Sequence, residues 1–373
     1  MDWWPFAVSA ACAGMLMPLA IHAKSIGHNG HQGVQQLHDV PTSRLGGIVV
    51  VVACAVTLAL VLSGGYEDTL LGLPLVLAVV PVVLLGLAED LTRSVRPRYR
   101  MAAAVVSAIL ASAYSGGIVP RLDLPLVDNL IPHMWFVLPL TWFMVAGACN
   151  AINLIDGAHG LAGGTCLIMF GGIALAAGWS GDGATLTEAL VVMGALAGFL
   201  FWNYPRGRVF LGDAGAYFLG FMYAELSIQL IARNSGISPW YVIMLAGYPI
   251  VDTLFAMYRR GVVRRVPLMA PDALHLHSLV FRRVAMPVER RQASRSLARA
   301  NARVAPRLWL HSALCLALAV LLHDNTPALW LGLAAYTAFY VGRYRELVLF
   351  RGRRTRRAAT DGDTNQVKRS NVS

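Results

Sequence analysis

Long apolar runs separated by short polar stretches dominate the chain. A bilayer core about 30 Å thick needs roughly 20 largely apolar residues per helix. About eleven runs of that length can be drawn, near residues 3–22, 46–63, 69–88, 101–119, 132–149, 160–178, 185–203, 214–232, 239–258, 308–323 and 327–343. The pattern predicts an all-α integral membrane protein, a polytopic bundle of about 11 transmembrane helices. Glu188, Glu225 and Asp252 fall inside three of these runs, and such groups usually face the protein interior or a watery cavity.

Composition agrees with this prediction. Hydrophobic residues make up 57% of the 373 residues and charged residues only 14%, against about 25% charged residues in typical soluble domains. A water-soluble globule is therefore excluded. The five cysteines lie in or beside apolar runs without paired spacing, so we expect buried thiols and no disulfide.

The net charge of +11 comes mainly from arginine, and its distribution predicts the orientation. Lys and Arg in short loops mark the cytoplasmic side of a membrane protein. With the N-terminus outside and the C-terminus in the cytoplasm, every basic residue except Arg121 and Arg233 falls on the cytoplasmic side. No basic residue precedes the first run, so we expect an uncleaved helix instead of a signal peptide. The positive charge is thus explained by the topology of the protein in the membrane, and no nucleic-acid partner is expected.

Two adjacent carboxylates, Glu89 and Asp90, end the third apolar run and are followed by a cluster of arginines. Two adjacent acidic side chains where a helix leaves the membrane cost free energy unless they are solvated, bind a cation or contact a substrate. The alternative is a solvated helix end with no further role.

The segment 150–164 carries Asn150, Asn153 and Asp156 at intervals of three, so they share one face of a helical turn. Carboxamide and carboxylate oxygens on one face suit a hard cation or a polar sugar nucleotide. Glycines beyond them permit close approach of the backbone to a ligand. The alternative is a turn with Asp156 as its capping residue.

The segment 203–215 contains Arg206 and Arg208 and ends in Asp213 between two glycines. Asp213 can cap the following helix. A carboxylate approached by two arginines also suits a magnesium diphosphate, because Mg²⁺ uses few carboxylates and completes its shell with water and phosphate oxygens.

Two histidines, His275 and His277, lie in a basic loop after the ninth run. A His-x-His pair is a weak transition-metal signal without further ligands, and imidazoles in a basic loop are better placed to contact phosphate. Asp252, seven residues before Arg259, lies about 10 Å inside the same membrane face. Asp252 is a candidate site residue or a helix-packing partner, and the histidines belong either to a phosphate site or to a solvated loop.

These four segments all lie on the predicted cytoplasmic side. In a transporter we would expect the functional charges near the middle of the membrane, with discontinuous helices and internal repeats. Convergence at one membrane face instead favours an enzyme that brings together a soluble, highly charged donor and a lipid acceptor.

The motifs and their order along the chain resemble those of the polyprenyl-phosphate N-acetylhexosamine-1-phosphate transferases. The resemblance covers residues 34–283 and is closest to the bacterial undecaprenyl-phosphate N-acetylglucosamine-1-phosphate branch. It is carried by His38–Gly47 (HDVPTSRLGG), Glu89–Asp90, Asn150–Gly164, Phe210–Gly215 (FLGDAG), Pro249–Asp252 and His275–His277.

The resemblance implies transfer of a sugar 1-phosphate from a UDP-N-acetylhexosamine to undecaprenyl phosphate, with release of UMP, at the cytoplasmic face of the bacterial inner membrane. The lipid-linked product would begin O-antigen, common-antigen or similar cell-surface polysaccharide. The resemblance also implies Mg²⁺ as cofactor, with Mn²⁺ as the alternative, and permits a homodimer. Asp213 would bind the metal with Asn153. Glu89, Asp90 and Asp213 would be catalytic. The expected substrate-binding residues are Arg44, Asn150, Asp156, His159, Arg206, Arg208, Asp252, His275 and His277.

We accordingly expect a membrane catalytic domain over residues 1–343 and a basic, disordered cytoplasmic tail over residues 344–373, in contact with membrane lipids. The active-site loops are expected at 34–47, 89–100, 150–164, 203–215 and 259–307.

Three residues depart from the family pattern. Glu89 and His159 stand where the family usually has Asp, and Ser278 replaces a third histidine, which argues against the peptidoglycan-precursor branch. The competing hypotheses are a polyisoprenoid or lipid transporter and an inactive homologue that binds the donor. The sequence does not name the sugar.

Overall fold

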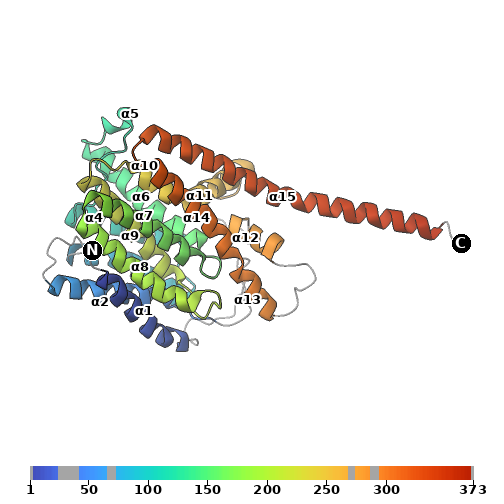
Figure 1. Ribbon diagram of the computed structural model, residues 1–373, viewed down its shortest axis with the longest axis horizontal. Coiled ribbons are helices and arrows are strands. Elements are labelled where there is room, and N and C mark those ends of the chain that lie inside the picture. The colour runs from blue at the N-terminus through green and yellow to red at the C-terminus, as the bar shows by residue number, and fades with distance from the viewer. Residues whose placement is uncertain (1–2, 24–41, 65–72, 268–273, 286–293, 371–373) are drawn as a thin grey trace.

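The computed structural model describes residues 3–23, 42–64, 73–267, 274–285 and 294–370. The described part consists of helices and connecting segments, with a single isolated β-bridge between Ser43 and Val209. Most helices lie side by side in one bundle, and α15 projects from it (Figure 1). The helices are α1 (Trp4–His22), α2 (Gly46–Ser63), α3 (Leu73–Thr92), α4 (Pro97–Tyr114), α5 (Pro125–Asp128), α6 (Met134–Ile155), α7 (Leu161–Ser180), α8 (Gly183–Asn203), α9 (Gly212–Arg233), α10 (Pro239–Leu245), α11 (Gly247–Tyr258), α12 (Leu276–Val280), α13 (Ser294–Ala302), α14 (Val304–Leu321) and α15 (Thr326–Ser370). Short π-helical turns, Arg259–Val263 and Phe281–Ala285, follow α11 and α12.

The all-helical membrane architecture is confirmed, whereas the predicted count of about 11 spans is not. Among the described residues, eight helices are long and apolar enough to cross a membrane, or nine if the bent pair α10 and α11 forms one span. The runs predicted at 101–119 and 327–343 lie on α4 and α15, which do not meet this test. The first turn of α4 contains Arg98 and Arg100, and α15 interrupts its apolar sequence with tyrosines such as Tyr336 and Tyr340.

The run predicted at 239–258 is a broken helix. α10 and the helix that begins at Gly247 meet at an angle of 76°. Gly247 follows the break, and Pro249 brings no N–H to the first turn of α11, so the sequence favours a bend at this point. The bend leaves Asp252 on a short helix whose buried face looks into the bundle.

Helix α9 lies at the centre of the bundle, and its residues from Gly212 to Ile231 are all buried. Small residues allow its first turns to approach α2 and α3 closely. A Cβ on Gly47 would lie 2.3 Å from the Gly215 nitrogen, and one on Gly86 would lie 2.5 Å from the Ala214 Cα. Glycine lets helix backbones approach each other inside membranes. This packing brings the C-terminal end of α3 next to the N-terminal end of α9.

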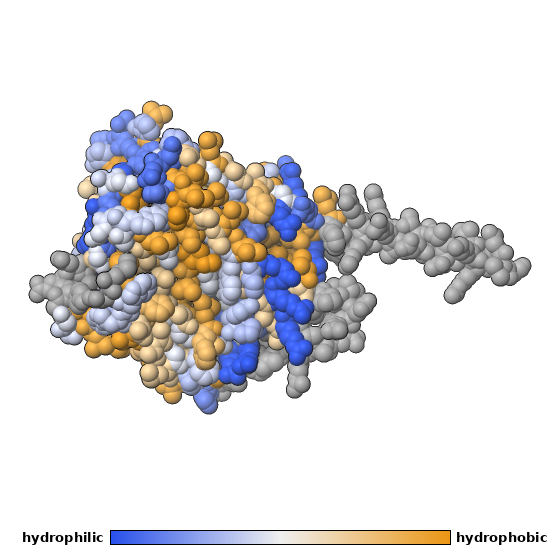
Figure 2. All heavy atoms as spheres, viewed as in Figure 1, coloured by the Kyte–Doolittle hydropathy of each residue, from blue (hydrophilic) through white to orange (hydrophobic). Residues whose placement is uncertain are grey.

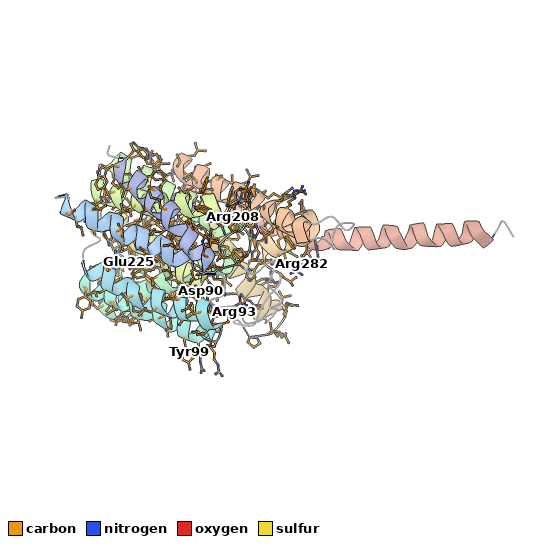
Figure 3. All side chains as sticks on the ribbon, turned by 90° about the horizontal axis from the view of Figure 1, so that it is seen from below. Asp90, Arg93, Tyr99, Arg208, Glu225 and Arg282 are labelled. Carbon is orange, nitrogen blue, oxygen red and sulfur yellow. The ribbon has the colours of Figure 1, made fainter. Side chains whose placement is uncertain are left out.

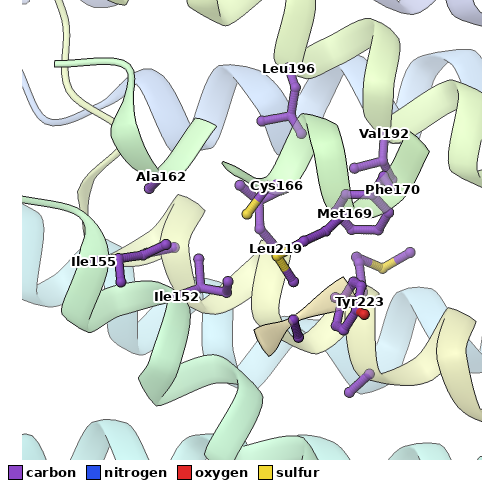
Figure 4. Packing of buried hydrophobic residues seen from close by; sticks show 14 of the residues in the cluster. Ile152, Ile155, Ala162, Cys166, Met169, Phe170, Val192, Leu196, Leu219 and Tyr223 are labelled. Carbon is purple, nitrogen blue, oxygen red and sulfur yellow. The ribbon is translucent and has the colours of Figure 1, made fainter. Parts of the chain in front are cut away.

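The apolar core is continuous through the middle of the bundle. Figure 4 shows side chains of α6, α7, α8 and α9 packed together, among them Ile152, Phe170, Leu196 and Leu219. Apolar residues occupy the middle of the face seen in Figure 2, and hydrophilic residues gather beside the projection of α15. This distribution is the one expected of a bundle that sits in a bilayer.

Arg121 and Arg233, the two basic residues of the predicted outer side, both have partners there. Arg121 pairs with Asp123 at 3.0 Å and donates to the carbonyl oxygens of Ser235 and Ile237. Arg233 lies 3.5 Å from Asp182. The predicted orientation itself stays a prediction.

The predicted division at residues 343 and 344 also stays a prediction, and α15 runs through it. Residues 38–41 of the first motif lie outside the described residues, as do residues 34–41, 268–273 and 286–293 of the expected active-site loops 34–47 and 259–307.

Candidate active site

The segment before α2 is held against the segment before α9. Phe210 N–H donates to the Ser43 carbonyl at 2.8 Å, and the N–H groups of Gly46 and Gly47 donate to the carbonyls of Phe210 and Leu211 at 3.0 and 2.8 Å. These backbone bonds fix Arg44 beside the N-terminus of α9, far from Arg44 in sequence.

A buried pair of carboxylates, Asp90 and Asp213, lies where α3 ends and α9 begins. The Asp90 Oδ1 accepts the Asp213 N–H at 2.9 Å, and its Oδ2 accepts the Ala214 N–H at 3.0 Å. Asp90 thereby satisfies two backbone donors of the first turn of α9, which have no partner within their own helix. In Figure 3, Asp90 lies nearer than Glu225 to the end from which α15 projects.

Two arginines neutralise this pair. The Arg44 Nε lies 3.4 Å from Asp90 Oδ1, and its Nη2 lies 3.0 Å from Asp213 Oδ1. Arg100, from α4, pairs with the other oxygen of Asp213. Arg44 is about one third exposed, so it can turn toward an anionic ligand. Arg100 belongs to the cluster of arginines that follows Asp90 in the sequence, and their spacing alone does not distinguish it from Arg93, Arg96 or Arg98.

Glu89 points elsewhere, although it adjoins Asp90. Its Oε2 accepts the Val95 N–H at 2.8 Å. Glu89 therefore stabilises the turn between α3 and α4, and α4 begins only two residues later and supplies Arg100. The adjacent acids have different contacts, and the predicted catalytic role of Glu89 stays a prediction.

The segment 150–164 joins two parts of the site. Asn150 and Asn153 lie half-buried on the last turns of α6, and Asp156 caps that helix. The Asp156 carboxyl faces the backbone N–H of Gly212, next to Asp213. Burial raises the pKa of the Asp156 carboxyl to about 6, although nearby Arg44 and the Gly212 N–H both lower it. Asp156 therefore adds a third carboxyl group to the surroundings of Arg44.

The second part of the site contains Asp252 and both histidines. His275 Nδ1 donates to Asp252 Oδ2 at 2.8 Å. The rings of His275 and His277 are stacked, with centroids 5.7 Å apart. The His277 ring covers Gly157, where a Cβ would lie 2.3 Å from Nε2. The Asn150–Gly164 motif and the histidine motif are thus in contact.

His277 is neutral near pH 7. Its pKa is lowered to about 4 by burial, by neighbouring His275 and by Arg282, while Asp252 acts in the opposite direction. A neutral imidazole offers one donor and one acceptor nitrogen, and Nδ1 of His277 is buried with no hydrogen-bond partner among the described residues. A ligand can therefore bond to this nitrogen.

His159, in contrast, faces the loop after α8. Its N–H at Nδ1 donates to the Pro205 carbonyl at 3.2 Å, and its ring packs on Phe210 at 5.7 Å. Its backbone N–H donates to the Asn301 side chain at 2.7 Å. The structure therefore gives His159 a packing position, and its predicted contact with substrate stays a prediction.

We expect this packing to make stability depend on pH. Burial lowers the pKa of His159 from 6.5 to about 4, so the unfolded chain binds a proton that the folded protein excludes. The contribution of His159 to the stability of the folded protein is complete above about pH 6.5 and is lost as the pH falls toward about 4. Thermal unfolding in detergent measures this effect. Between about pH 7.5 and pH 5.5, the free energy of unfolding should fall by about 1 kcal/mol more for the wild type than for His159→Gln. A difference between the two proteins that does not change with pH would contradict this assignment.

Arg206 and Arg208 are exposed, and the structure does not bring them to the carboxylates. The Arg208 guanidinium lies over the Trp202 ring, 5.6 Å from its centroid. The predicted role of these two arginines in donor binding stays a prediction.

The oxygen atoms at the site suit a hard cation. In the part of the chain that the structure describes, no group of three or more His, Cys, Asp or Glu residues could hold a metal ion. Mg²⁺ needs only one or two carboxylates when phosphate oxygens and water supply the other ligands. Asp213 offers such a carboxylate once Arg44 or Arg100 releases one of its oxygens. The predicted second ligand, Asn153, stays a prediction.

Sequence comparison places these motifs in a known context. A family model described as glycosyl transferase family 4 matches residues 72–231. The chain is 30% identical over 275 residues to a probable undecaprenyl-phosphate N-acetylglucosaminyl 1-phosphate transferase of Bacillus subtilis, covering 73% of this chain and 75% of that protein. It is 29% identical over 289 residues to a phospho-N-acetylmuramoyl-pentapeptide-transferase of Bacillus cytotoxicus, covering 73% and 86%. It is 30% identical over 214 residues to an undecaprenyl-phosphate alpha-N-acetylglucosaminyl 1-phosphate transferase of Thermotoga maritima, covering 57% and 62%.

Proposed function

We propose that the chain, which belongs to glycosyl transferase family 4, is a membrane phosphotransferase acting on a nucleotide sugar. It transfers N-acetylhexosamine 1-phosphate from a UDP-sugar to undecaprenyl phosphate. The products are UMP and an undecaprenyl-diphosphate sugar, the first lipid-linked intermediate of a cell-surface polysaccharide. The reaction takes place at the cytoplasmic face of the inner membrane.

The observation that carries this proposal is the group formed by Asp90, Asp213, Arg44 and Arg100, where the ends of three helices meet. Phosphoryl transfer depends on positioning and on neutralising the negative charge of the phosphates. Two guanidinium groups at the end of the bundle meet that need for a donor from solution and a phosphate at the membrane surface.

Direct displacement fits these residues best. An oxygen of the lipid phosphate attacks the β-phosphorus of the donor, the bond from that phosphorus to the bridging oxygen breaks, and UMP leaves with the electron pair. A phosphate monoester is mostly ionised near pH 7, with its second pKa at about 6, so the acceptor needs little help from a base. Asp90 already accepts two backbone N–H groups and contacts Arg44. Asp90 therefore acts as an orienting group.

Asp213 and Asn153 would hold Mg²⁺, with Mn²⁺ as the alternative. When bound, the metal would neutralise the diphosphate and polarise its phosphorus–oxygen bonds. The arginine that leaves Asp213 would then be available to a phosphate oxygen.

Product analysis tests this function. Purified protein is incubated with undecaprenyl phosphate, Mg²⁺ and a mixture of UDP-N-acetylhexosamines, and the lipid fraction is analysed by mass spectrometry. We expect one undecaprenyl-diphosphate sugar and an equal amount of UMP. The mass of the lipid product limits which N-acetylhexosamines the sugar can be. Folded protein that forms no lipid-linked product from any donor would refute the proposal.

A further inference from the structure

Asp252 is a buried carboxylate with three hydrogen-bond donors. His275 Nδ1 donates to its Oδ2 at 2.8 Å, and the Leu276 N–H donates to its Oδ1 at 3.2 Å. The third donor is the hydroxyl of Tyr340, 2.5 Å from Oδ1. Asp252 and Tyr340 are each 1% exposed. With three donors, Asp252 is held as an anion in one orientation.

The orientation of Asp252 determines that of His275. Because Nδ1–H donates to the carboxylate, Nε2 is the ring nitrogen left for another partner. Nε2 is buried and has no hydrogen-bond partner among the described residues. A buried polar atom without a partner is costly, so this nitrogen is a candidate contact for a ligand.

A second contact joins α15 to the same end of the bundle. One turn after Tyr340, the Tyr344 hydroxyl accepts a hydrogen bond from Arg259 Nη1 at 2.8 Å. The Arg259 guanidinium lies beside the contacting rings of Phe255 and Tyr344, 5.9 and 5.3 Å from their centroids. One face of α15 therefore contacts both a carboxylate and a guanidinium of the α11 segment.

We propose that Tyr340 is a positioning residue for the sugar-phosphate donor: from α15 it holds Asp252, and Asp252 holds His275 with Nε2 directed at the donor's phosphates. The inference rests on the proposed function and adds a role for the last helix, which carries none of the family motifs. Held by the Asp252 carboxylate, the His275 ring presents Nε2 to the donor in one orientation.

Tyr340→Phe removes the hydroxyl and keeps the ring, which packs on Phe255 with centroids 5.8 Å apart. We expect the KM for the UDP-sugar to rise about tenfold, because one hydrogen bond to a buried charge is lost. The KM for undecaprenyl phosphate should stay unchanged. A general loss of folded protein would instead lower kcat and leave both KM values unchanged.

Tyr336→Phe is the matched control. Tyr336 lies one turn earlier on α15 and is also 1% exposed, but its hydroxyl lies 3.3 Å from His311 Nδ1. Its donor KM should stay within about twofold of the wild type. A double-mutant cycle adds a second test: in the Asp252→Asn background, Tyr340→Phe should raise the donor KM no further if Tyr340 acts through Asp252.

Each outcome has one interpretation. A wild type that transfers sugar phosphate, with a raised donor KM in Tyr340→Phe alone, supports the positioning role. An active wild type with equal donor KM in Tyr340→Phe and Tyr336→Phe, or additive effects with Asp252→Asn, overturns the positioning role and leaves the proposed function intact. A folded wild type without transfer activity overturns the proposed function and this inference with it.

Discussion

Asp213→Asn should lower kcat/KM for sugar-phosphate transfer by about a thousandfold. The substitution keeps the size of the side chain and removes the charge that faces Arg44 and Arg100. Both guanidinium groups would lose their common partner, and the proposed metal would lose its carboxylate ligand. Steady-state release of UMP at saturating lipid acceptor measures the loss.

Asp182→Asn is the matched control for Asp213→Asn. Asp182 is also an aspartate at the N-terminal end of a helix with an arginine partner, because it caps α8 and lies 3.5 Å from Arg233. Asparagine is as good an N-cap as aspartate. Since Asp182 lies at the opposite end of the bundle, we expect its substitution to leave transfer within about twofold of the wild type. Equal activity in the two variants would remove Asp213 from the active site.

The adjacent acids should differ sharply in their response to substitution. Asp90→Ala leaves the N–H groups of Asp213 and Ala214 without their acceptor. We expect a loss of about 3 kcal/mol of stability and about a hundredfold of kcat/KM, because the first turn of α9 also carries Asp213. Glu89→Gln keeps an oxygen that can accept the Val95 N–H, so its activity should stay within about threefold of the wild type. Thermal unfolding and UMP release measure the two effects.

A large loss of activity in Glu89→Gln with folded protein would show that the charge of Glu89 acts in the reaction itself. Retained activity in Asp90→Ala would show that the first turn of α9 does not need its acceptor. Either result would contradict the different roles inferred from the contacts of the two acids.

Much of the fold and of the site could be predicted from the sequence, because both depend on strong local patterns. The apolar runs predicted the helices, and the motifs predicted Asp90, Asp213 and Asp252 as site residues. The span count is harder to predict. α4 begins with arginines and α15 contains buried tyrosines, so neither has the hydropathy of a simple span.

The pairing of particular side chains could not be predicted, because it depends on helix packing. The sequence does not show which of Glu89 and Asp90 accepts the backbone N–H groups of α9, because this depends on how α9 approaches α3. Tyr340 carries no motif and lies 88 residues from Asp252. His159 occupies a motif position, but its ring bonds to the carbonyl of Pro205.

The most direct test of the central claim follows the donor's β-phosphorus. The protein is incubated with undecaprenyl phosphate and a UDP-N-acetylhexosamine labelled with ³²P at the β-position, and the lipid and nucleotide fractions are separated. Transfer of sugar 1-phosphate predicts that the label moves into the lipid diphosphate and that the UMP is unlabelled. Label that stays with the nucleotide as UDP would show transfer of the sugar alone and would contradict the account.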